Sequence, residues 1–216
     1  QAGLAAWIGN LYGHLPNLMG GPAYWSVTPL TSGRQSTPAG IPIGFEEDSA
    51  YLGPLGALVE ASLAVPNAVK QVGAMDAFRY VTLLHLLTTT DLRLISVWNP
   101  TFLTLLLDAL VRWWDALLDD MARGTLTLAS DIDAKLHARL VARLRPDPTR
   151  AQTLRPLDPR DPETLARIWP RLALVSCWAD GPSARFAAEL AARLPHVPMQ
   201  PKGLLATEAM VSLPWV

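Results

Sequence analysis

Cysteine is almost absent from this chain: Cys177 is the only one, and it lies inside an apolar run. A single cysteine excludes an internal disulfide framework and any zinc site built from cysteines. We interpret Cys177 as a small buried hydrophobic residue. The four histidines do not show metal-ligand spacing, so we interpret them as surface or structural residues.

Charge is scarce as well. Charged residues make up 17% of the 216 residues, the net charge is −1, and no block of basic residues occurs. A chain with this charge balance has no basic patch that would attract nucleic acid or anionic lipid. Half of the residues (50%) are hydrophobic, which is typical of a globular chain with a substantial core rather than a disordered one.

A long uninterrupted apolar segment is also missing. The best membrane candidate, residues 101–123, is crossed by charges at helical spacing: Asp108, Arg112, Asp115, Asp119 and Arg123. Such a stripe indicates the solvent face of a helix in a water-soluble domain, not a lipid-facing surface. No signal peptide opens the chain. We therefore expect a cytoplasmic protein.

Three common nucleotide and hydrolase motifs do not occur. The chain has no G-x-S-x-G elbow, no G-x-x-x-x-G-K-[ST] loop and no G-x-G-x-x-G fingerprint. These absences argue against an α/β-hydrolase, a P-loop NTPase and a Rossmann dehydrogenase.

Strands and helices alternate along the sequence. Branched and aromatic runs predict strands at 23–29, 92–98, 172–179 and 203–206, and "IPIGF" predicts a short one near residue 43. Apolar periodicity predicts helices at 2–13, 76–87, 101–123 and 183–194. This alternation favours an α/β fold with a mainly parallel sheet flanked by helices.

Local signals mark several boundaries. Asn99 and Pro100 suit the start of the helix that we expect to end at Gly124. Ser130 and Asp133 are spaced as a capping box for a further helix, whose apolar face runs from Ile132 to Leu144. Residues 146–162 are rich in proline and predict a long loop.

Polar side chains follow three of the expected strands. Parallel sheets bind ligands beyond the carboxyl ends of their strands, so Asn99, Asp180–Gly181 and Thr207–Glu208 would meet on one rim. Asp180 can also be interpreted as a helix cap, and Glu208 as a solvated turn residue. The neighbours of Glu208 are apolar, and a carboxylate held there needs a partner. A Mg²⁺ ion that also contacts ligand phosphates would satisfy it.

Aromatic and basic residues near the rim allow two interpretations. Trp98 and Trp178 lie near the ends of central strands, and with Trp169 they are either core residues or pocket wall. Arg34 lies in a polar loop, where it is either a surface residue or the partner of a substrate carboxylate.

Four segments in series resemble one enzyme family. "TPAGIP" (37–42), "LISVWNPTFLTLLLDAL" (94–110), "RIWPRLALVSCWADG" (167–181) and "VPMQPKGLLATEA" (197–209) together resemble the auxin-responsive acyl acid amido synthetase family. The resemblance implies an ATP-dependent ligase that converts a carboxylic acid to an acyl-AMP with release of pyrophosphate. It then transfers the acyl group to an amine, usually an amino acid.

The resemblance also assigns roles at the last strand. Residues Leu204 to Glu208 occupy the position of the family's aromatic–Gly–Ser–Ser/Thr–Glu motif. Thr207 would contact the α-phosphate, Glu208 would serve Mg²⁺, and Ala206 would lie beside the nucleotide. Leu204 would contact the acyl group, but Leu204 and Leu205 depart from the pattern because the aromatic residue is missing.

Two further segments carry implied contacts. Asp180–Gly181 stands where the family has a Thr-Gly pair beside the nucleotide; Gly181 matches and Asp180 departs. Trp98, Asn99 and Phe102 correspond to part of the acyl-site wall.

The resemblance further implies a fragment. We expect residues 1–216 to be a central piece of the large amino-terminal domain, with a phosphate loop upstream and a carboxyl-terminal domain downstream. The departures from the family pattern leave two alternatives open. One is a non-catalytic relative that binds a carboxylic acid or a nucleotide, and the other is a scaffold without a ligand.

Overall fold

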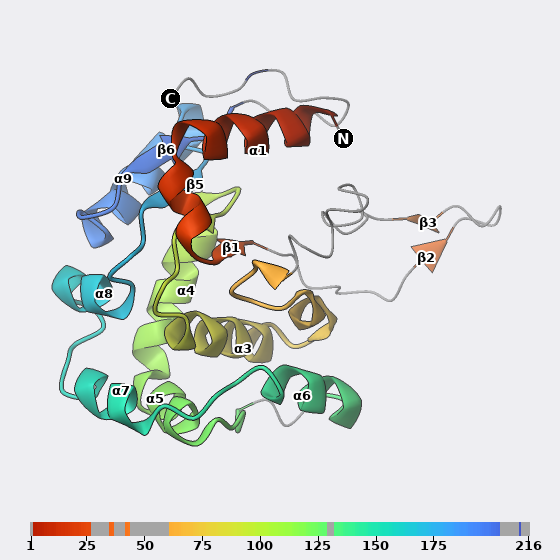
Figure 1. Cartoon of the computed structure of the whole chain (residues 1–216), viewed down its shortest axis with the longest axis vertical. Helices are drawn as coiled ribbons and strands as arrows, with labels where there is room; N and C mark the ends of the chain where they lie inside the picture. The colour runs from red at the N-terminus through yellow and green to blue at the C-terminus, as the bar shows by residue number, and fades with distance from the viewer. Residues whose placement is uncertain are drawn as a thin grey trace.

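A four-stranded parallel sheet organises the computed structural model (Figure 1), which describes residues 2–26, 35–36, 42–43, 61–128, 132–203 and 212. The strand order is β1 (Ala23–Trp25), β4 (Leu94–Ser96), β5 (Leu174–Cys177), β6 (Met199–Pro201). Each neighbouring pair is parallel. A small antiparallel pair joins β2 (Gln35–Ser36) to β3 (Pro42–Ile43). The predicted α/β fold with a mainly parallel sheet is confirmed.

Helices connect and cover the strands. The α-helices are α1 (Ala2–His14), α3 (Met75–Thr88), α4 (Pro100–Arg112), α5 (Trp114–Arg123), α6 (Ala134–Val141), α7 (Pro148–Leu154), α8 (Pro162–Ile168) and α9 (Ala184–Arg193). Short 3-10 turns occur at η1 (Pro16–Gly20), η3 (Asn67–Gln71) and η4 (Gly181–Ser183).

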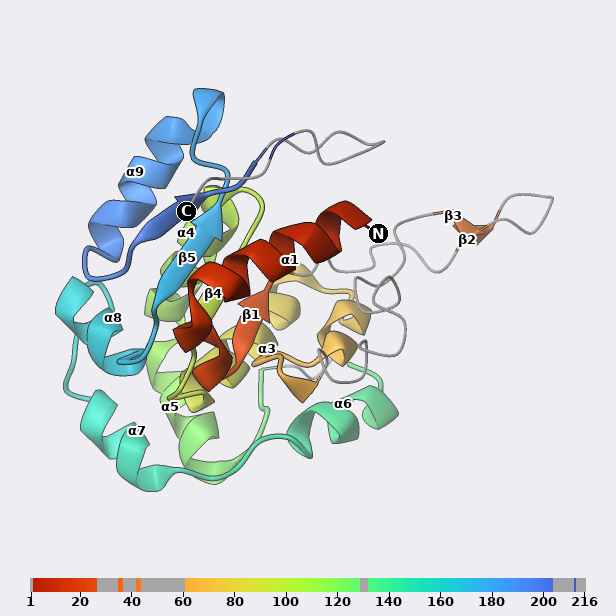
Figure 2. The ribbon, with the colours of Figure 1, turned by 45° about the horizontal axis from the view of Figure 1, so that its top comes forward.

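The two faces of the sheet meet different layers. Helix α1 crosses one face (Figure 2), where Trp7 and Leu11 cluster with Leu94 of β4 and Leu174 of β5. Helices α3, α4 and α9 belong to the larger cluster on the opposite face, which includes Ile95 of β4. Strands covered on both faces carry apolar residues at successive positions, which explains why they were recognisable in the sequence.

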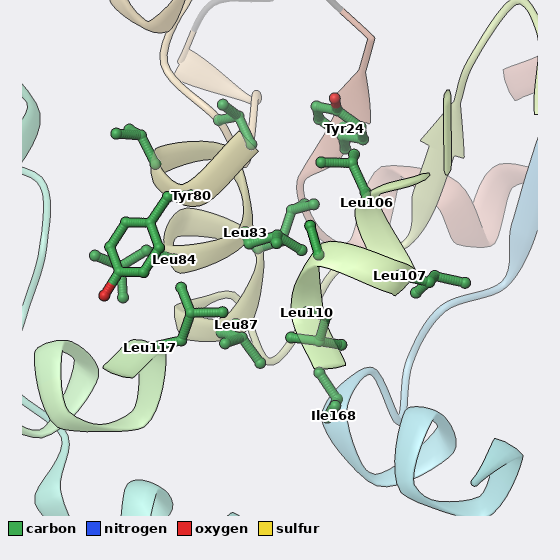
Figure 3. Close-up of a cluster of buried hydrophobic side chains, with 14 of the residues drawn as sticks. Tyr24, Tyr80, Leu83, Leu84, Leu87, Leu106, Leu107, Leu110, Leu117 and Ile168 are labelled. Atoms are coloured by element: carbon green, nitrogen blue, oxygen red, sulfur yellow. The ribbon is translucent and has the colours of Figure 1, made fainter. Parts of the chain in front are cut away.

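The main core lies on the face opposite α1 (Figure 3). Leu83, Leu84 and Leu87 of α3 pack with Leu110 of α4 and Leu117 of α5. Each of these side chains is fully buried, and burying one leucine contributes about 1.5–3 kcal/mol to folding.

Trp169 belongs to this core rather than to a pocket wall. It is 1% exposed, and its indole N–H donates to the Leu86 carbonyl at 2.9 Å.

The predicted helix over 101–123 is two helices. It breaks at Trp113, whose φ of −113° and ψ of 18° leave the helical region. The Trp113 ring packs edge-on against Tyr80 of α3, with ring centroids 5.7 Å apart. This tertiary contact coincides with the break, and neither Pro nor Gly marks it in the sequence.

The predicted loop over 146–162 is wrong, because it contains α7. Asp147 accepts a hydrogen bond from the Arg150 N–H, and Pro148 occupies the first turn. Asp161 and Pro162 start α8 in the same way. An Asp-Pro pair supplies a capping oxygen and a preset φ, so these prolines begin helices instead of preventing them.

The start of α6 also differs from the prediction. Asp133 is itself the N-cap, accepting from the Lys135 and Leu136 N–H groups. The expected capping box is therefore wrong in its register, and Ser130 lies outside the described residues. Leu136 and Leu140 are buried as predicted.

The fourth strand lies upstream of its predicted position. We expected it at 203–206, but β6 spans Met199–Pro201, and 204–206 lie outside the described residues. Pro201 has no backbone N–H to donate. This is tolerated because β6 is the last strand in the described order and pairs there with β5 alone. The pairing of β6 with β5 includes a hydrogen bond in which the Val175 N–H donates to the Pro198 carbonyl at 3.0 Å.

A buried carboxylate holds α5 to its surroundings. Asp120 is 0% exposed and accepts hydrogen bonds from the hydroxyls of Tyr80 (2.7 Å), Thr125 (2.6 Å) and Thr127 (2.9 Å). The Thr127 N–H donates to it at 2.8 Å. Burial by itself would raise the pKa of Asp120, but the hydrogen bonds outweigh it and hold the pKa below its usual value.

Replacing Asp120 with Asn should destabilise the protein by about 2–4 kcal/mol. One carboxylate oxygen would become an NH₂ group, which cannot accept hydrogen bonds from the surrounding hydroxyl and N–H donors. Urea denaturation followed by circular dichroism measures the change. Asp119→Asn is the matched control, since Asp119 is 48% exposed in its pair with Arg155 and should cost under ~1 kcal/mol. Equal losses for the two variants would show that the Asp120 hydrogen bonds contribute no special stability.

Candidate functional site

The strand exits lie side by side at the carboxyl edge of the sheet. Backbone pairing continues beyond the named strands: Trp178 N–H donates to Trp98 C=O at 2.8 Å, and Lys202 N–H donates to Cys177 C=O at 2.8 Å. The segments after β4, β5 and β6 therefore leave the sheet as neighbours. The exits of β4 and β5 are neighbours, as expected for Asn99 and Asp180–Gly181; the third expected exit, Thr207–Glu208, lies outside the described residues.

Two tryptophans cover part of this edge. The rings of Trp98 and Trp178 lie 5.7 Å apart and are tilted by 50°. Trp178 is 37% exposed, so the pair offers an aromatic surface at the rim. Both residues were expected at this position.

Asn99 serves first as a helix cap. Its Oδ1 accepts from the Thr101 N–H at 3.0 Å and from the Thr101 hydroxyl at 2.9 Å, which confirms the predicted cap of α4. Phe102 lies in the first turn of α4 with 50% of its surface exposed. Its ring is therefore available to a ligand or to another part of the protein.

Asp180 and Gly181 form the turn after β5. Gly181 has a φ of +56°, a left-handed conformation that favours glycine. Asp180 precedes η4, but its side chain makes no capping hydrogen bond. The helix-cap interpretation of Asp180 is therefore wrong, and its carboxylate is exposed at the rim.

The remaining predicted site residues lie outside the described residues. They are Arg34, Leu204, Leu205, Ala206, Thr207 and Glu208.

Sequence reasoning missed a buried lysine at the rim. Lys202 is 8% exposed, and its Nζ donates to Ser96 Oγ at 2.8 Å. The ammonium lies 4.3 Å from the centre of the Trp7 ring and 4.6 Å from that of Trp98. The signal available in the sequence was a lone lysine between the proline-flanked β6 and an apolar run.

Cys177 behaves as predicted. It is fully buried, and burial raises the pKa of its thiol to about 11, although the Lys202 charge acts in the opposite direction. A protonated, buried thiol is a poor nucleophile.

A cavity of about 410 Å³ lies at the opposite edge of the sheet. It is lined in part by Pro22 before β1, Asp91 before β4, Arg143 and His85. His85 is 4% exposed. Burial, together with the Arg143 charge, lowers the pKa of His85 to about 4. Because this cavity lies at the amino ends of the strands, it is separate from the rim.

The low pKa of His85 predicts a pH-dependent stability. Between pH 6.5 and 4 the unfolded chain takes up a proton that the folded protein excludes, so the free energy of unfolding should fall with falling pH. The loss should approach roughly 3 kcal/mol near pH 4. Urea titrations of wild type and His85→Gln across this range measure it as a difference in slope.

Exposed His196→Gln is the control for this effect, and it should reproduce the wild-type profile. A His85→Gln profile parallel to that of wild type would contradict the assignment of a buried neutral imidazole.

The described part of the chain lacks both a metal-binding cluster and a membrane-spanning helix. It contains no group of three or more His, Cys, Asp or Glu that could hold a metal ion. No helix within the same residues is long and apolar enough to cross a bilayer.

The fold is an α/β domain with a four-stranded parallel sheet, and comparison with known proteins places it in a family. The GH3 family N-terminal domain matches residues 4–199. The chain belongs to the GH3 family, which confirms the resemblance to acyl acid amido synthetases. No curated protein matches the chain.

Solved structures show the same fold. One match is "GH3.15 acyl acid amido synthetase", with a TM-score of 0.74, 16% identity, and coverage of 96% of this chain and 37% of that one. Another is "AtGH3.15 acyl acid amido synthetase in complex with 2,4-DB", with a TM-score of 0.73, 18% identity, and coverage of 92% and 35%. The chain therefore spans little more than a third of these structures.

Proposed function

We propose that this chain is the central part of the large amino-terminal domain of an ATP-dependent acyl acid–amido synthetase. The observation that carries the proposal is the match of residues 4–199 to the GH3 family. The parallel strands support it, because they bring the exits at Asn99 and Gly181 to one edge, where such sheets bind ligands. The proposed ligands are ATP, a carboxylic acid and an amine, with amino acids as the expected acceptors.

The proposed reaction has two steps. A carboxylate oxygen attacks the α-phosphorus of ATP; the new O–P bond forms as the bond to the bridging oxygen breaks, and pyrophosphate leaves. The amine nitrogen then attacks the acyl carbon, AMP leaves, and the nitrogen gives up a proton. Both steps concentrate negative charge on oxygen atoms, so positioned donors and cations accelerate them.

Thr207 and Glu208 have the central roles in this proposal. The Thr207 hydroxyl would donate to the α-phosphate beside Ala206. The Glu208 carboxylate is an oxygen donor of the kind that Mg²⁺ prefers, and the bound ion would neutralise phosphate charge. Asp180 and Gly181 would lie beside the nucleotide.

The acyl group would occupy the aromatic side of the rim. Trp98 supplies a ring beside Trp178, and Phe102 has an exposed ring. Asn99 and Leu204 would complete the wall, and Arg34 would pair with the substrate carboxylate. Rings of this kind suit a flat or apolar acid. A cytoplasmic location remains a prediction.

Glu208→Ala should reduce acid-dependent pyrophosphate release about a hundredfold or more, because the proposed carboxylate ligand of the metal is lost. The assay uses the protein expressed from its complete reading frame with ATP, Mg²⁺ and a panel of aryl and aliphatic acids. Glu189→Ala on α9 is the matched control, since Glu189 is exposed, and it should retain wild-type activity.

Two outcomes would contradict the proposal. Wild-type protein that releases no pyrophosphate with any acid of a broad panel, yet binds an acid or ATP, would be a non-catalytic relative. Full activity of Glu208→Ala would remove Glu208 from the reaction.

A further inference from the structure

The cavity of about 410 Å³ at the amino edge of the sheet has no role in the proposed function. Its volume falls within the range of small-molecule sites. Three parts of the chain supply most of its wall: residues in the range 61–64, the carboxyl end of α3, and residues in the range 143–147 that follow α6. These parts are far apart in the sequence, so the fold itself creates the cavity.

Two arginines of this wall are held in place by the backbone around them. Leu144, which lies between Arg143 and Arg145, is 8% exposed and belongs to the main core. Two residues after Arg145, the Asp147 N–H donates to the Met121 carbonyl at 2.9 Å. The backbone that carries both guanidinium groups is therefore anchored to the rest of the domain.

Neither guanidinium has a carboxylate partner among the described residues. Elsewhere in the described chain, Arg155 and Arg193 pair with aspartates. Arg143 and Arg145 are exposed, and they make neither an ion pair nor a side-chain hydrogen bond to any residue that the structure describes. Their positive charge is therefore not neutralised by direct contact.

Two carboxylates line the same cavity but do not contact these arginines. Asp147 caps α7, where it accepts a hydrogen bond from the Arg150 N–H at 2.9 Å. Asp91 is exposed and forms no ion pair within the described ranges. The acceptors for the two guanidinium groups must therefore come from water or from a ligand.

His85 adds a buried polar group to the α3 wall of the cavity. It is 4% exposed, and its Nε2 atom has no hydrogen-bond partner among the described residues. The hydroxyls of Thr88 and Thr89 do not serve the ring, because they donate to the His85 main-chain carbonyl at 3.0 and 2.8 Å. A buried polar atom without a partner is rare in proteins.

The His85 ring is neutral at pH 7. Burial and the nearby Arg143 charge lower the pKa of His85 to about 4. A neutral imidazole keeps one N–H donor. The cavity wall therefore offers two cations and one neutral donor, and these groups suit a ligand that accepts hydrogen bonds and carries negative charge.

We propose that this cavity binds a small oxyanion, a phosphate or a carboxylate group, through Arg143 and Arg145. Guanidinium groups form charged and often bidentate hydrogen bonds with both kinds of oxyanion. His85 would contribute a neutral donor from α3. The inference goes beyond the proposed function, whose ATP and acid would bind at the carboxyl edge of the sheet.

A bound oxyanion would connect two separate parts of the domain. His85 lies on α3, whereas Arg143 and Arg145 lie in the segment that leads into α7. A ligand held by both parts binds only the folded protein, so its binding should also stabilise the fold.

Isothermal titration calorimetry tests the site on the protein expressed from its complete reading frame. Inorganic phosphate and sulfate are the tetrahedral probes, malonate and succinate are the carboxylate probes, and sodium chloride keeps the ionic strength constant. Arg143→Gln and Arg145→Gln should each weaken binding of the preferred probe roughly tenfold to a hundredfold, as expected for one lost charged hydrogen bond.

Two further variants separate the cavity from general surface charge. Arg139→Gln removes an exposed cation of α6 that does not line the cavity, and it should bind the probes as wild type does. Ala61→Trp keeps both arginines but fills space at the cavity wall. Ala61 is exposed, so the protein should tolerate the larger side chain, and measurable binding should be lost.

The preferred probe identifies the source of the oxyanion. Tighter binding of phosphate and sulfate than of malonate and succinate assigns the cavity to a phosphoryl ligand. The reverse order assigns it to a carboxylate ligand.

Three results would overturn the inference. Wild-type protein that binds none of the four probes excludes the site. Equal losses in Arg139→Gln and Arg143→Gln would show a diffuse attraction by surface charge. Wild-type affinity of Ala61→Trp would place the bound anion outside the cavity.

Discussion

The parallel register of the four described strands is the constraint on which the rest depends. It aligns Trp25, Ser96, Ser176 and Gln200 in one row and places Leu94 and Leu174 in the row before it. A slip of one residue in any strand would exchange its two faces. Leucines would then face the polar row, and hydroxyls would enter the dry core behind the sheet. The rim therefore depends on the same backbone pairing that builds the fold.

Two buried charges are held by different kinds of contact in this fold. Asp120 is surrounded by donors that meet its oxygens, from Tyr80, Thr125 and Thr127. Its network is complete, and it ties α5 to α3. Lys202 donates to Ser96 Oγ and lies against the faces of the Trp7 and Trp98 rings. The complete network of Asp120 therefore contributes rigidity where α5 meets α3.

Much of the fold was predictable because its signals are local. The apolar runs of β4 and β5, the Asn99 cap and the Gly124 helix end each depend on neighbouring residues. The break at Trp113 was not predictable, since it accompanies a contact with Tyr80 of another helix. The Asp-Pro pairs that start α7 and α8 are visible in the sequence, but the high proline content of this segment led to the prediction of a loop.

Of the candidate site, the sequence predicted the edge of the sheet but not the contacts made there. Parallel strands indicated a rim, and Trp98, Asn99, Asp180 and Gly181 lie there. The contact between Lys202 and Ser96 joins residues 106 positions apart, which no local pattern reports. Roles for Arg34, Leu204, Ala206, Thr207 and Glu208 remain predictions.

The meeting of Trp7 with Lys202 has a consequence for how the chain is made. On the ribosome α1 emerges before the other described elements, but the ammonium that lies under Trp7 follows only after every described helix has been synthesised. Helix α1 therefore lacks this contact on its tryptophan side until β6 and Lys202 have been synthesised. Long-range closure of this kind slows folding and prolongs the exposure of apolar surface. The need for chaperones during synthesis should therefore depend more on the late contact between α1 and Lys202 than on the leucine-rich helices α3, α4 and α5, whose packing partners are close in sequence.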